Sequence, residues 1–123
     1  MAATAIRISG RERADVVPGS RGRTSAAAIV IDTVDRLARE AGFSVAHDQP
    51  YRGGFSTGHY GRPEHAVHAV QVELNRKLYM NELSLEKKPR EFEALRAFCR
   101  RLTRELASLE PRAARPTRDA AGV

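Results

Sequence analysis

Residues 50–82 read PYRGGFSTGHYGRPEHAVHAVQVELNRKLYMNE, and the rest of the chain is organised around this stretch. It contains three of the four histidines, all three tyrosines and four of the nine glycines of the chain. Within it, residues 66–74, AVHAVQVEL, are rich in valine and long enough for a buried strand. Side chains alternate across a strand, so Gln71, Glu73 and Asn75 share one face. An amide, a carboxylate and a second amide in a row predict a sheet edge that opens into a polar pocket.

A turn-rich segment, residues 51–63, precedes this strand. Its paired glycines, Gly53 and Gly54, allow positive φ and a close approach of the backbone, and Pro63 favours an extended conformation for Arg62. A long loop with Tyr, His, Arg and Gly beside a strand carboxylate is typical of an active-site loop. An ordinary surface loop beside a hydrogen-bonded polar strand has the same composition, so composition leaves both interpretations open.

Two segments, PYRGGFSTGHYGRP at residues 50–63 and VHAVQVELNRKLYMNE at residues 67–82, resemble the C-terminal signature of the N-formylglutamate amidohydrolase family. Upstream, ADVVPGSRGRTSA at residues 14–26 resembles that family's A-D-V-V-L-G-D-R-x-G-T-S-A segment. It departs from the pattern where Pro18 replaces an apolar residue and Ser20 replaces an aspartate, and the following Gly-Arg pair is out of the usual order.

The resemblance covers about residues 10–110 and implies both a fold and an activity. The family's members are zinc-dependent hydrolases of amino-acid catabolism, which cleave the amide bond of N-formyl or N-acyl amino acids such as N-formyl-L-glutamate. Their three-layer α/β fold is the phosphorylase/hydrolase-like fold of the zinc carboxypeptidases. We therefore expect the C-terminal part of such an α/β fold, with its elements in the order helix–strand–loop–strand–helix.

The family's metal ligands lie largely in two segments that this sequence lacks. One is a P-H-[SA]-G run near the N-terminus, and the other is an acidic-x-His-Ser run ahead of the A-D-V-V segment. Residues 1–9 contain no histidine at all. We therefore expect a truncated protein whose family cofactor is zinc, but which by itself binds no metal and is inactive as an enzyme.

The resemblance also implies roles for five residues. Glu73 matches the glutamate of Q-x-E-[LI]-N-R, which takes a proton from zinc-bound water and returns it to the leaving amine. Arg62 and Arg76 are candidates for binding the substrate's carboxylates, because a guanidinium offers two parallel hydrogen bonds. His59 and Tyr60 are candidates for stabilising an oxyanion or orienting the substrate. Each has a structural alternative, which for Glu73 is an ion pair with Arg62 or Arg76.

The local histidines do not predict a metal site of their own. His65 and His68 are three residues apart, but Pro63 and the following strand make presentation on a helix unfavourable. His59 lies on a glycine-rich loop, and no H-E-x-x-H motif or Cys/His cluster supplies the three converging ligands that catalytic zinc requires. We assign no residue to a metal. His68, on the strand face opposite Glu73, is predicted to be packed and hydrogen-bonded.

Composition indicates one soluble domain at most, with 123 residues, 41% hydrophobic and 29% charged. No apolar run is long enough to span a membrane, and the N-terminus does not resemble a signal peptide, so we expect a cytoplasmic protein. The net charge of +6 belongs to the two ends of the chain. Residues 26–110 hold 13 Lys and Arg against 12 Asp and Glu. No nucleic-acid motif accompanies this charge, so we expect no specific nucleic-acid partner.

In chain order, we expect a loose basic arm at residues 1–13, a domain at residues 14–110 and a disordered tail at residues 111–123. The domain should contain, in order, the following elements: a strand at 14–17, a helix capped by Thr24 or Ser25 that ends at 40–41 with Gly42 at C′, a strand at 43–47, the strand at 66–74, and a helix at 89–109 with Pro89 in its first turn. The last helix carries an apolar stripe of Phe92, Leu95, Phe98, Cys99, Leu102, Leu106 and Leu109. Cys99 is read as a packing residue.

The expected ligand is a small acidic N-acyl amino acid, and the expected protein partner is a second copy of the chain or a missing N-terminal half. The alternative, from another functional class, is a non-catalytic remnant that binds a carboxylate ligand or a partner protein. The sequence leaves the substrate's side chain and the oligomeric state open.

Overall fold

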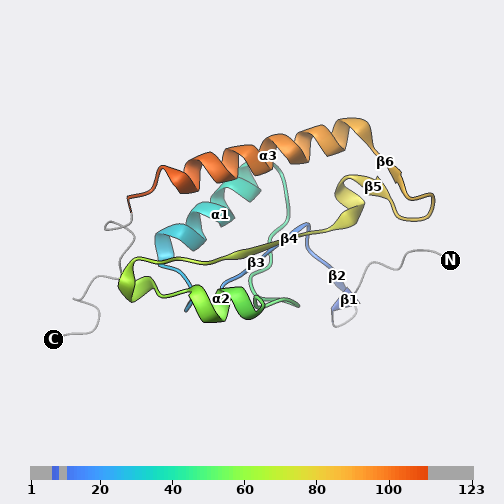
Figure 1. Ribbon diagram of the computed structural model, residues 1–123. Helices are drawn as coiled ribbons and strands as arrows, with labels where there is room; N and C mark the ends of the chain where they lie inside the picture. The colour runs from blue at the N-terminus through green and yellow to red at the C-terminus, as the bar shows by residue number, and fades with distance from the viewer. Residues whose placement is uncertain (1–6, 9–10, 111–123) are drawn as a thin grey trace.

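The computed structural model describes residues 7–8 and 11–110 (Figure 1). The elements in chain order are β1 (Arg7–Ile8), β2 (Arg11–Glu12), β3 (Val16–Gly19), α1 (Ala28–Glu40), α2 (Phe55–Tyr60), η1 (Pro63–His65), β4 (Gln71–Leu74), η2 (Arg76–Leu78), β5 (Met80–Asn81), β6 (Glu86–Lys87) and α3 (Pro89–Ala107). The strands pair as β1–β2, β3–β4 and β5–β6, each antiparallel. The tail predicted at residues 111–123 lies outside the described residues, as does most of the predicted basic arm.

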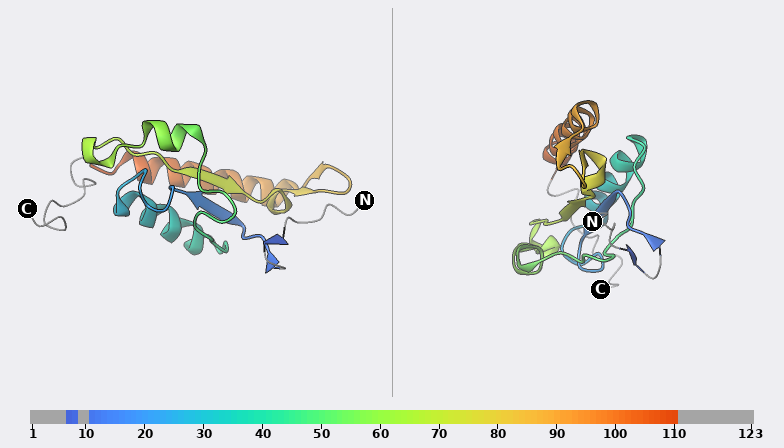
Figure 2. Two further views of the ribbon diagram at one scale, coloured as in Figure 1. Left: turned by 90° about the horizontal axis from the view of Figure 1, so that it is seen from below. Right: turned by 90° about the vertical axis from the view of Figure 1, so that its right-hand side faces the viewer.

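The β3–β4 pair lies between two helical layers (Figures 1 and 2). Helices α1 and α3 cover one face, and α2 lies on the other. The pairing places Val16 opposite Leu74 and Val17 opposite Glu73. Because neighbouring residues of a strand point to opposite faces, the first pair contributes to the core under α1 and α3, and Glu73 points towards the α2 side. A mixed α/β layered fold, as expected from the sequence, is confirmed at this level.

The core is built where the apolar stripes of α1 and α3 meet β3. Leu95, Phe98 and Leu102 of α3 are buried, as the spacing of its apolar residues predicted. Phe98 packs edge-on against Phe43, with ring centroids 5.2 Å apart. Each such side chain contributes about 1.5–3 kcal/mol on burial. Cys99 packs against the same cluster, and burial raises the pKa of its thiol, which confirms the interpretation of Cys99 as a packing residue.

The start of α1 differs from the prediction, and its end agrees. The prediction that Thr24 or Ser25 caps the helix is wrong, because Ala27 occupies the N-cap and no side chain caps it from within the turn. The hydroxyl of Ser25 donates instead to the carbonyl of Ala69, at 2.6 Å. The backbone N–H of Ala27 donates to Nδ1 of His68, at 3.0 Å. A distant side chain therefore satisfies a donor at the helix start, which local sequence does not reveal.

At the other end of α1, Gly42 has φ of +87°, as its predicted C′ position requires. The N–H of Gly42 donates to the carbonyl of Arg39 at 2.9 Å, and that of Phe43 donates to the carbonyl of Ala38 at 3.0 Å. These two bonds form a Schellman motif and satisfy carbonyls that the helix end leaves free.

Three predicted strands are shorter or displaced in the structure. The strand expected at residues 66–74 is restricted to β4, because Ala66 is in the left-handed region at φ +58° and Val67 forms a turn-like bridge with Arg62. In the strand expected at residues 43–47, Val45 makes a single parallel bridge with Val16. The strand expected at 14–17 is β3, two residues later. Strand length depends on available partners, which a valine-rich pattern does not specify.

The segment expected to be a long loop, residues 51–63, contains α2 and the start of η1. Gly54 precedes α2 in an extended conformation, and Gly61 follows it. Among the described helices, none combines the length with the apolar content that a membrane span would need.

Candidate functional site

Glu73 lies half-buried on β4, on the side of the strand pair that faces α2. Its Oε1 accepts a hydrogen bond from Nε2 of Gln71, two residues earlier on the same strand face. The shared face of Gln71 and Glu73, predicted from strand alternation, is thus confirmed. In the described part of the chain, no hydrogen bond involves the second carboxylate oxygen, Oε2.

The other end of the Gln71 amide is held by the turn before α2. The backbone N–H of Gly54 donates to Oε1 of Gln71, at 2.9 Å. The carbonyl of Gly54 in turn accepts from the hydroxyl of Thr57, at 2.7 Å. A continuous chain of hydrogen bonds therefore joins the first turn of α2, through Gln71, to the carboxylate of Glu73.

A close approach of two backbone segments fixes this turn over the strand pair. A Cβ on Gly19 would lie 2.6 Å from the backbone nitrogen of Gly53, and a Cβ on Gly53 would lie 2.3 Å from Oγ1 of Thr57. Gly53 also has φ of +101°. Gly19 is paired with Gln71 in the strand register, so the contact lies beside the site. Gly53 thus has the positive φ and the close backbone approach that were predicted for the Gly53–Gly54 pair, whereas Gly54 has φ of −89°.

His59 and Tyr60 lie at the C-terminal end of α2, in an exposed aromatic group with Phe55. The rings of Phe55 and His59 are stacked with centroids 4.7 Å apart, and Tyr60 meets His59 edge-on at 4.7 Å. Phe55 is 74% exposed and Tyr60 is 60% exposed. Both predicted site residues therefore belong to the helix whose first turn holds Gln71, although no described hydrogen bond joins either of them to Glu73.

Arg62 precedes β4 in the sequence, and Arg76 follows it. Arg62 is exposed and its backbone bridges Val67. Arg76 is in η2, directly after β4, and its exposed Nε lies 3.6 Å from a carboxylate oxygen of Glu82. Within residues 11–110, neither arginine forms an ion pair with Glu73. The described partner of Glu73 is Gln71, which differs from the ion pair considered as the structural alternative.

Asn75, the third member of the predicted polar row, follows β4 and caps η2. Its Oδ1 accepts from the N–H of Lys77 at 3.2 Å, and its buried Nδ2 has no hydrogen-bond partner among the described residues. Sequence reasoning placed Gln71 on the correct face but did not assign it the bridging role. The two-residue spacing of Gln71 and Glu73 indicates that their side chains can meet on one strand face. The contact of Gln71 with Gly54 is not visible in the sequence, because Gly54 lies 17 residues earlier.

His68 is packed and hydrogen-bonded, as predicted. Burial lowers the pKa of its imidazole, and Nδ1 accepts from the Ala27 N–H, so the neutral ring carries its proton on Nε2. His65 is exposed on η1. The described residues contain no group of three His, Cys, Asp or Glu side chains that could hold a metal ion. They therefore do not fit the zinc site that the resemblance implies.

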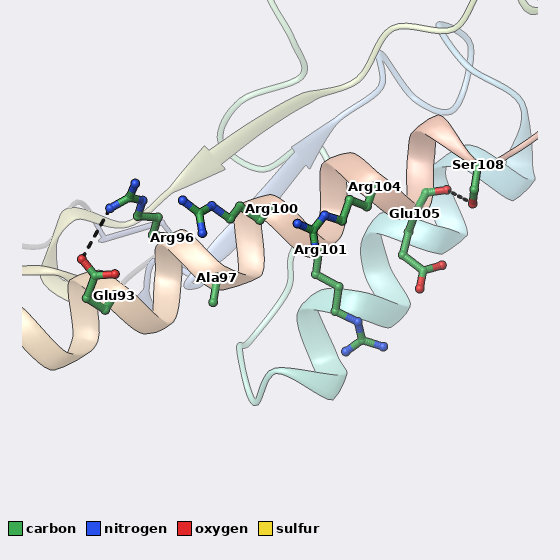
Figure 3. A pocket seen from close by; sticks show the side chains of 8 residues that line it. All are labelled: Glu93, Arg96, Ala97, Arg100, Arg101, Arg104, Glu105 and Ser108. Atoms are coloured by element: carbon green, nitrogen blue, oxygen red, sulfur yellow. Dashed lines mark hydrogen bonds and ion pairs between the residues drawn. The ribbon is translucent and has the colours of Figure 1, made fainter.

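The hollows formed by the described residues include the following two. One, of about 660 Å³, is bordered by α2, the segment before β4 and the end of α3, and its polar lining includes Thr57, His68 and Gln71. The other, of about 560 Å³, is lined by side chains of α3 and of its C-cap Ser108, with Arg96, Arg100 and Arg104 among them (Figure 3). The first shares Gln71 with the candidate site, and the second contains none of the predicted site residues.

Comparisons with known proteins bear on the family and the fold of the chain. The sequence model of a family described as N-formylglutamate amidohydrolase matches residues 1–80. An N-formylglutamate deformylase of Pseudomonas aeruginosa is 47% identical over 45 residues, which are 37% of this chain and 17% of that protein. A crystal structure of N-formylglutamate amidohydrolase from Ralstonia eutropha superposes with a TM-score of 0.71 and 32% identity, covering 81% of this chain. The chain spans 36% of that solved structure. By sequence and by fold, the chain belongs to the N-formylglutamate amidohydrolase family.

Proposed function

We propose that this chain supplies the C-terminal part of the active site of an amidohydrolase, which hydrolyses the amide bond of an N-formyl or N-acyl amino acid. Family membership supports the class of reaction. The observation that carries the proposal is the Glu73 carboxylate, which is held by Gln71 on the α2 side of the strand pair. We further propose that the rest of the active site comes from polypeptide outside these 123 residues, in a three-layer fold like that of the zinc carboxypeptidases.

In this proposal Glu73 transfers a proton during hydrolysis. As water attacks the carbonyl carbon, a carboxylate oxygen of Glu73 accepts the water's proton. It then delivers that proton to the amide nitrogen as the carbon–nitrogen bond breaks, so that the amine leaves neutral. Gln71 occupies Oε1, which leaves Oε2 for the water. A carboxylate with one oxygen fixed and one free is suited to this role.

Zinc is the cofactor that the resemblance implies, but the described residues do not supply three ligands for it. We therefore assign no metal ligand to this chain. The chain's contribution is limited to proton transfer and substrate binding. We propose that any metal-binding residues lie in the polypeptide that completes the active site.

Substrate binding is proposed for residues on both sides of Glu73. Arg62 and Arg76 would bind carboxylates of a small acidic N-acyl amino acid, and His59 and Tyr60 would contact its polar groups. Nε of Arg76 lies 3.6 Å from Oε1 of Glu82, in a contact that is exposed on the Arg76 side and mostly buried on the Glu82 side. The exposed guanidinium has further N–H donors with which a substrate carboxylate can pair.

The proposal is tested by replacing Glu73 in a complete enzyme. The chain is fused behind the N-terminal part of the Pseudomonas aeruginosa deformylase, and formate release from N-formyl-L-glutamate is measured. Glu73→Gln should lower kcat by roughly 10²–10⁴-fold, the range typical of acid–base catalysis, with the metal content and circular dichroism unchanged. Glu64→Gln, which neutralises an exposed glutamate of η1, is the matched control. A near-normal kcat in Glu73→Gln would contradict the proposed role.

A further inference from the structure

We infer that Gln71 is the positioning residue of this site, which holds the Glu73 carboxylate in place and couples it to the first turn of α2. The inference rests on the proposed function of Glu73. The proposed function uses Gln71 only as the hydrogen-bond partner of one carboxylate oxygen, and the inference extends this contact to the position of the carboxylate and to α2. The argument depends on the orientation of its side-chain amide.

Two independent contacts fix that orientation. The backbone N–H of Gly54 is a donor, so the atom of Gln71 that meets it at 2.9 Å must be the carbonyl oxygen, Oε1. An ionised carboxylate only accepts hydrogen bonds, so the atom that meets Glu73 must be the NH₂ group. Reversing the amide would break both bonds at once. Gln71 therefore donates to Glu73, in a charge-assisted bond of the stronger kind.

The hydrogen bond selects which oxygen of Glu73 is free to react. An isolated glutamate on a strand samples several rotamers, and its two oxygens exchange places. With Oε1 held by Gln71, the side chain is restrained and Oε2 remains unoccupied in the described structure. Displacing a reacting group by about 1 Å can cost on the order of 10²-fold in rate. Loss of the Gln71 donor should therefore lower kcat more than KM.

The same amide connects Glu73 to the helix that carries the exposed aromatic group. Gly54 bonds to Gln71 through its N–H and to Thr57 through its carbonyl, so the start of α2 cannot move without disturbing Gln71. His59 lies in the last turn of this six-residue helix. A substrate that displaces α2 through His59 would thus change the position of the carboxylate.

Two substitutions at Gln71 separate its contact with Gly54 from its contact with Glu73. Gln71→Glu keeps an oxygen for the Gly54 N–H but replaces the donor to Glu73 by a second acceptor. Gln71→Leu removes both contacts. Gln49→Glu adds the same charge on an exposed side chain and serves as the matched control. The thermal unfolding temperature of each variant reports any general effect on folding.

The first measurement is made by NMR on the full chain and does not depend on catalytic activity. In carbon-13 NMR, Glu73 should populate one dominant rotamer in the wild type and in Gln49→Glu, and should average over several in both Gln71 variants. Amide exchange at Gly54 should stay slow in Gln71→Glu and become at least about tenfold faster in Gln71→Leu. If Glu73 keeps its wild-type rotamer distribution in both Gln71 variants, the inference is wrong.

The second readout is kinetic, in the fusion enzyme described above. Gln71→Glu should lower kcat by roughly 10–100-fold with KM within about twofold of wild type. A normal kcat in Gln71→Glu, with kcat lost in Glu73→Gln, would overturn the positioning role alone. A normal kcat in Glu73→Gln would overturn the proposed function and, with it, the catalytic meaning of Gln71.

Discussion

Arg76 follows β4 within two residues of Leu74 and presents an exposed guanidinium beside Glu82. If it binds a substrate carboxylate, Arg76→Ala in the fusion enzyme should raise KM for N-formyl-L-glutamate, with kcat changed much less. Loss of a hydrogen bond to a charged group corresponds to about 1.5–3 kcal/mol, or roughly 10–100-fold in KM. Arg62→Ala tests the second candidate in the same way, and Arg90→Ala replaces an exposed arginine outside the site. Unchanged KM in both single variants would remove the arginines from the substrate site.

Asp35 links α1 to the segment that leads into the site. Burial of its carboxyl acts to raise the pKa, but hydrogen bonds from His47 at 2.7 Å and Arg39 at 2.9 Å outweigh this and hold the pKa below its ordinary value of 3.8. Because the pKa of Asp35 is lower in the folded than in the unfolded protein, its charge stabilises the fold at pH values above the unfolded pKa. This stabilisation is lost as the pH falls through the lower pKa of the folded state.

Asp35→Asn should therefore lower the free energy of unfolding at pH 7 by up to about 1 kcal/mol, because the contacts are partly solvated. The difference from wild type should shrink as the pH falls below 3.8. Urea unfolding at pH 7 and pH 3 measures both values. A deficit of equal size at the two pH values would show that the charge of Asp35 does not contribute.

At the scale of elements, the sequence predicted what depends on local pattern. The stripe of α3, Pro89 in its first turn and Gly42 after α1 all follow from helical spacing and end signals, and all are found in the structure. The shared face of Gln71 and Glu73 follows from strand alternation in the same way.

What the sequence did not predict depends on partners that are far apart in the chain. The glycine-rich sequence of residues 51–63 predicts a loop, yet contacts of Gly53 and Gly54 with β3 and β4 hold the first turn of α2 there. The His68 bond that satisfies Ala27 spans 41 residues. The bridging role of Gln71 escapes sequence analysis for the same reason. Its side chain accepts from the N–H of Gly54, before α2, and donates to Glu73, on β4.

The contact between β3 and the turn before α2 gives a prediction for the stability of the fold. Gly19→Ala places a Cβ 2.6 Å from the Gly53 nitrogen, and backbone atoms cannot move aside as a side-chain end can. Such overpacking should lower the free energy of unfolding by about 1–3 kcal/mol. Urea unfolding followed by circular dichroism measures the loss.

Gly58→Ala is the matched control for this substitution. Its Cβ would meet the flexible end of Arg21, with Nε at 3.1 Å, and alanine is up to about 1 kcal/mol better than glycine within a helix. Gly58→Ala should therefore be neutral or stabilising. Equal stability of Gly19→Ala and wild type would show that the two backbone segments are not held together as described.

For the whole molecule, the distribution of titratable residues gives a prediction about zinc. Among residues 7–8 and 11–110, no three candidate ligands are grouped, so the purified chain should retain less than one equivalent of zinc after dialysis. Atomic absorption measures the retained metal, and His59→Ala and His65→Ala test whether either histidine binds it. Stoichiometric zinc that is lost on either substitution would show a metal site within this chain.

Reconstitution from two polypeptides tests whether these residues complete an amidohydrolase site through Glu73. The purified chain is titrated into the N-terminal part of the Pseudomonas aeruginosa deformylase, expressed as a separate polypeptide, and formate release from N-formyl-L-glutamate is followed. We predict no turnover by either polypeptide alone, turnover that rises and saturates with the concentration of the wild-type chain, and a loss of roughly 10²–10⁴-fold with the Glu73→Gln chain. Turnover by the chain alone, or equal turnover with the wild-type and Glu73→Gln chains, would contradict the account.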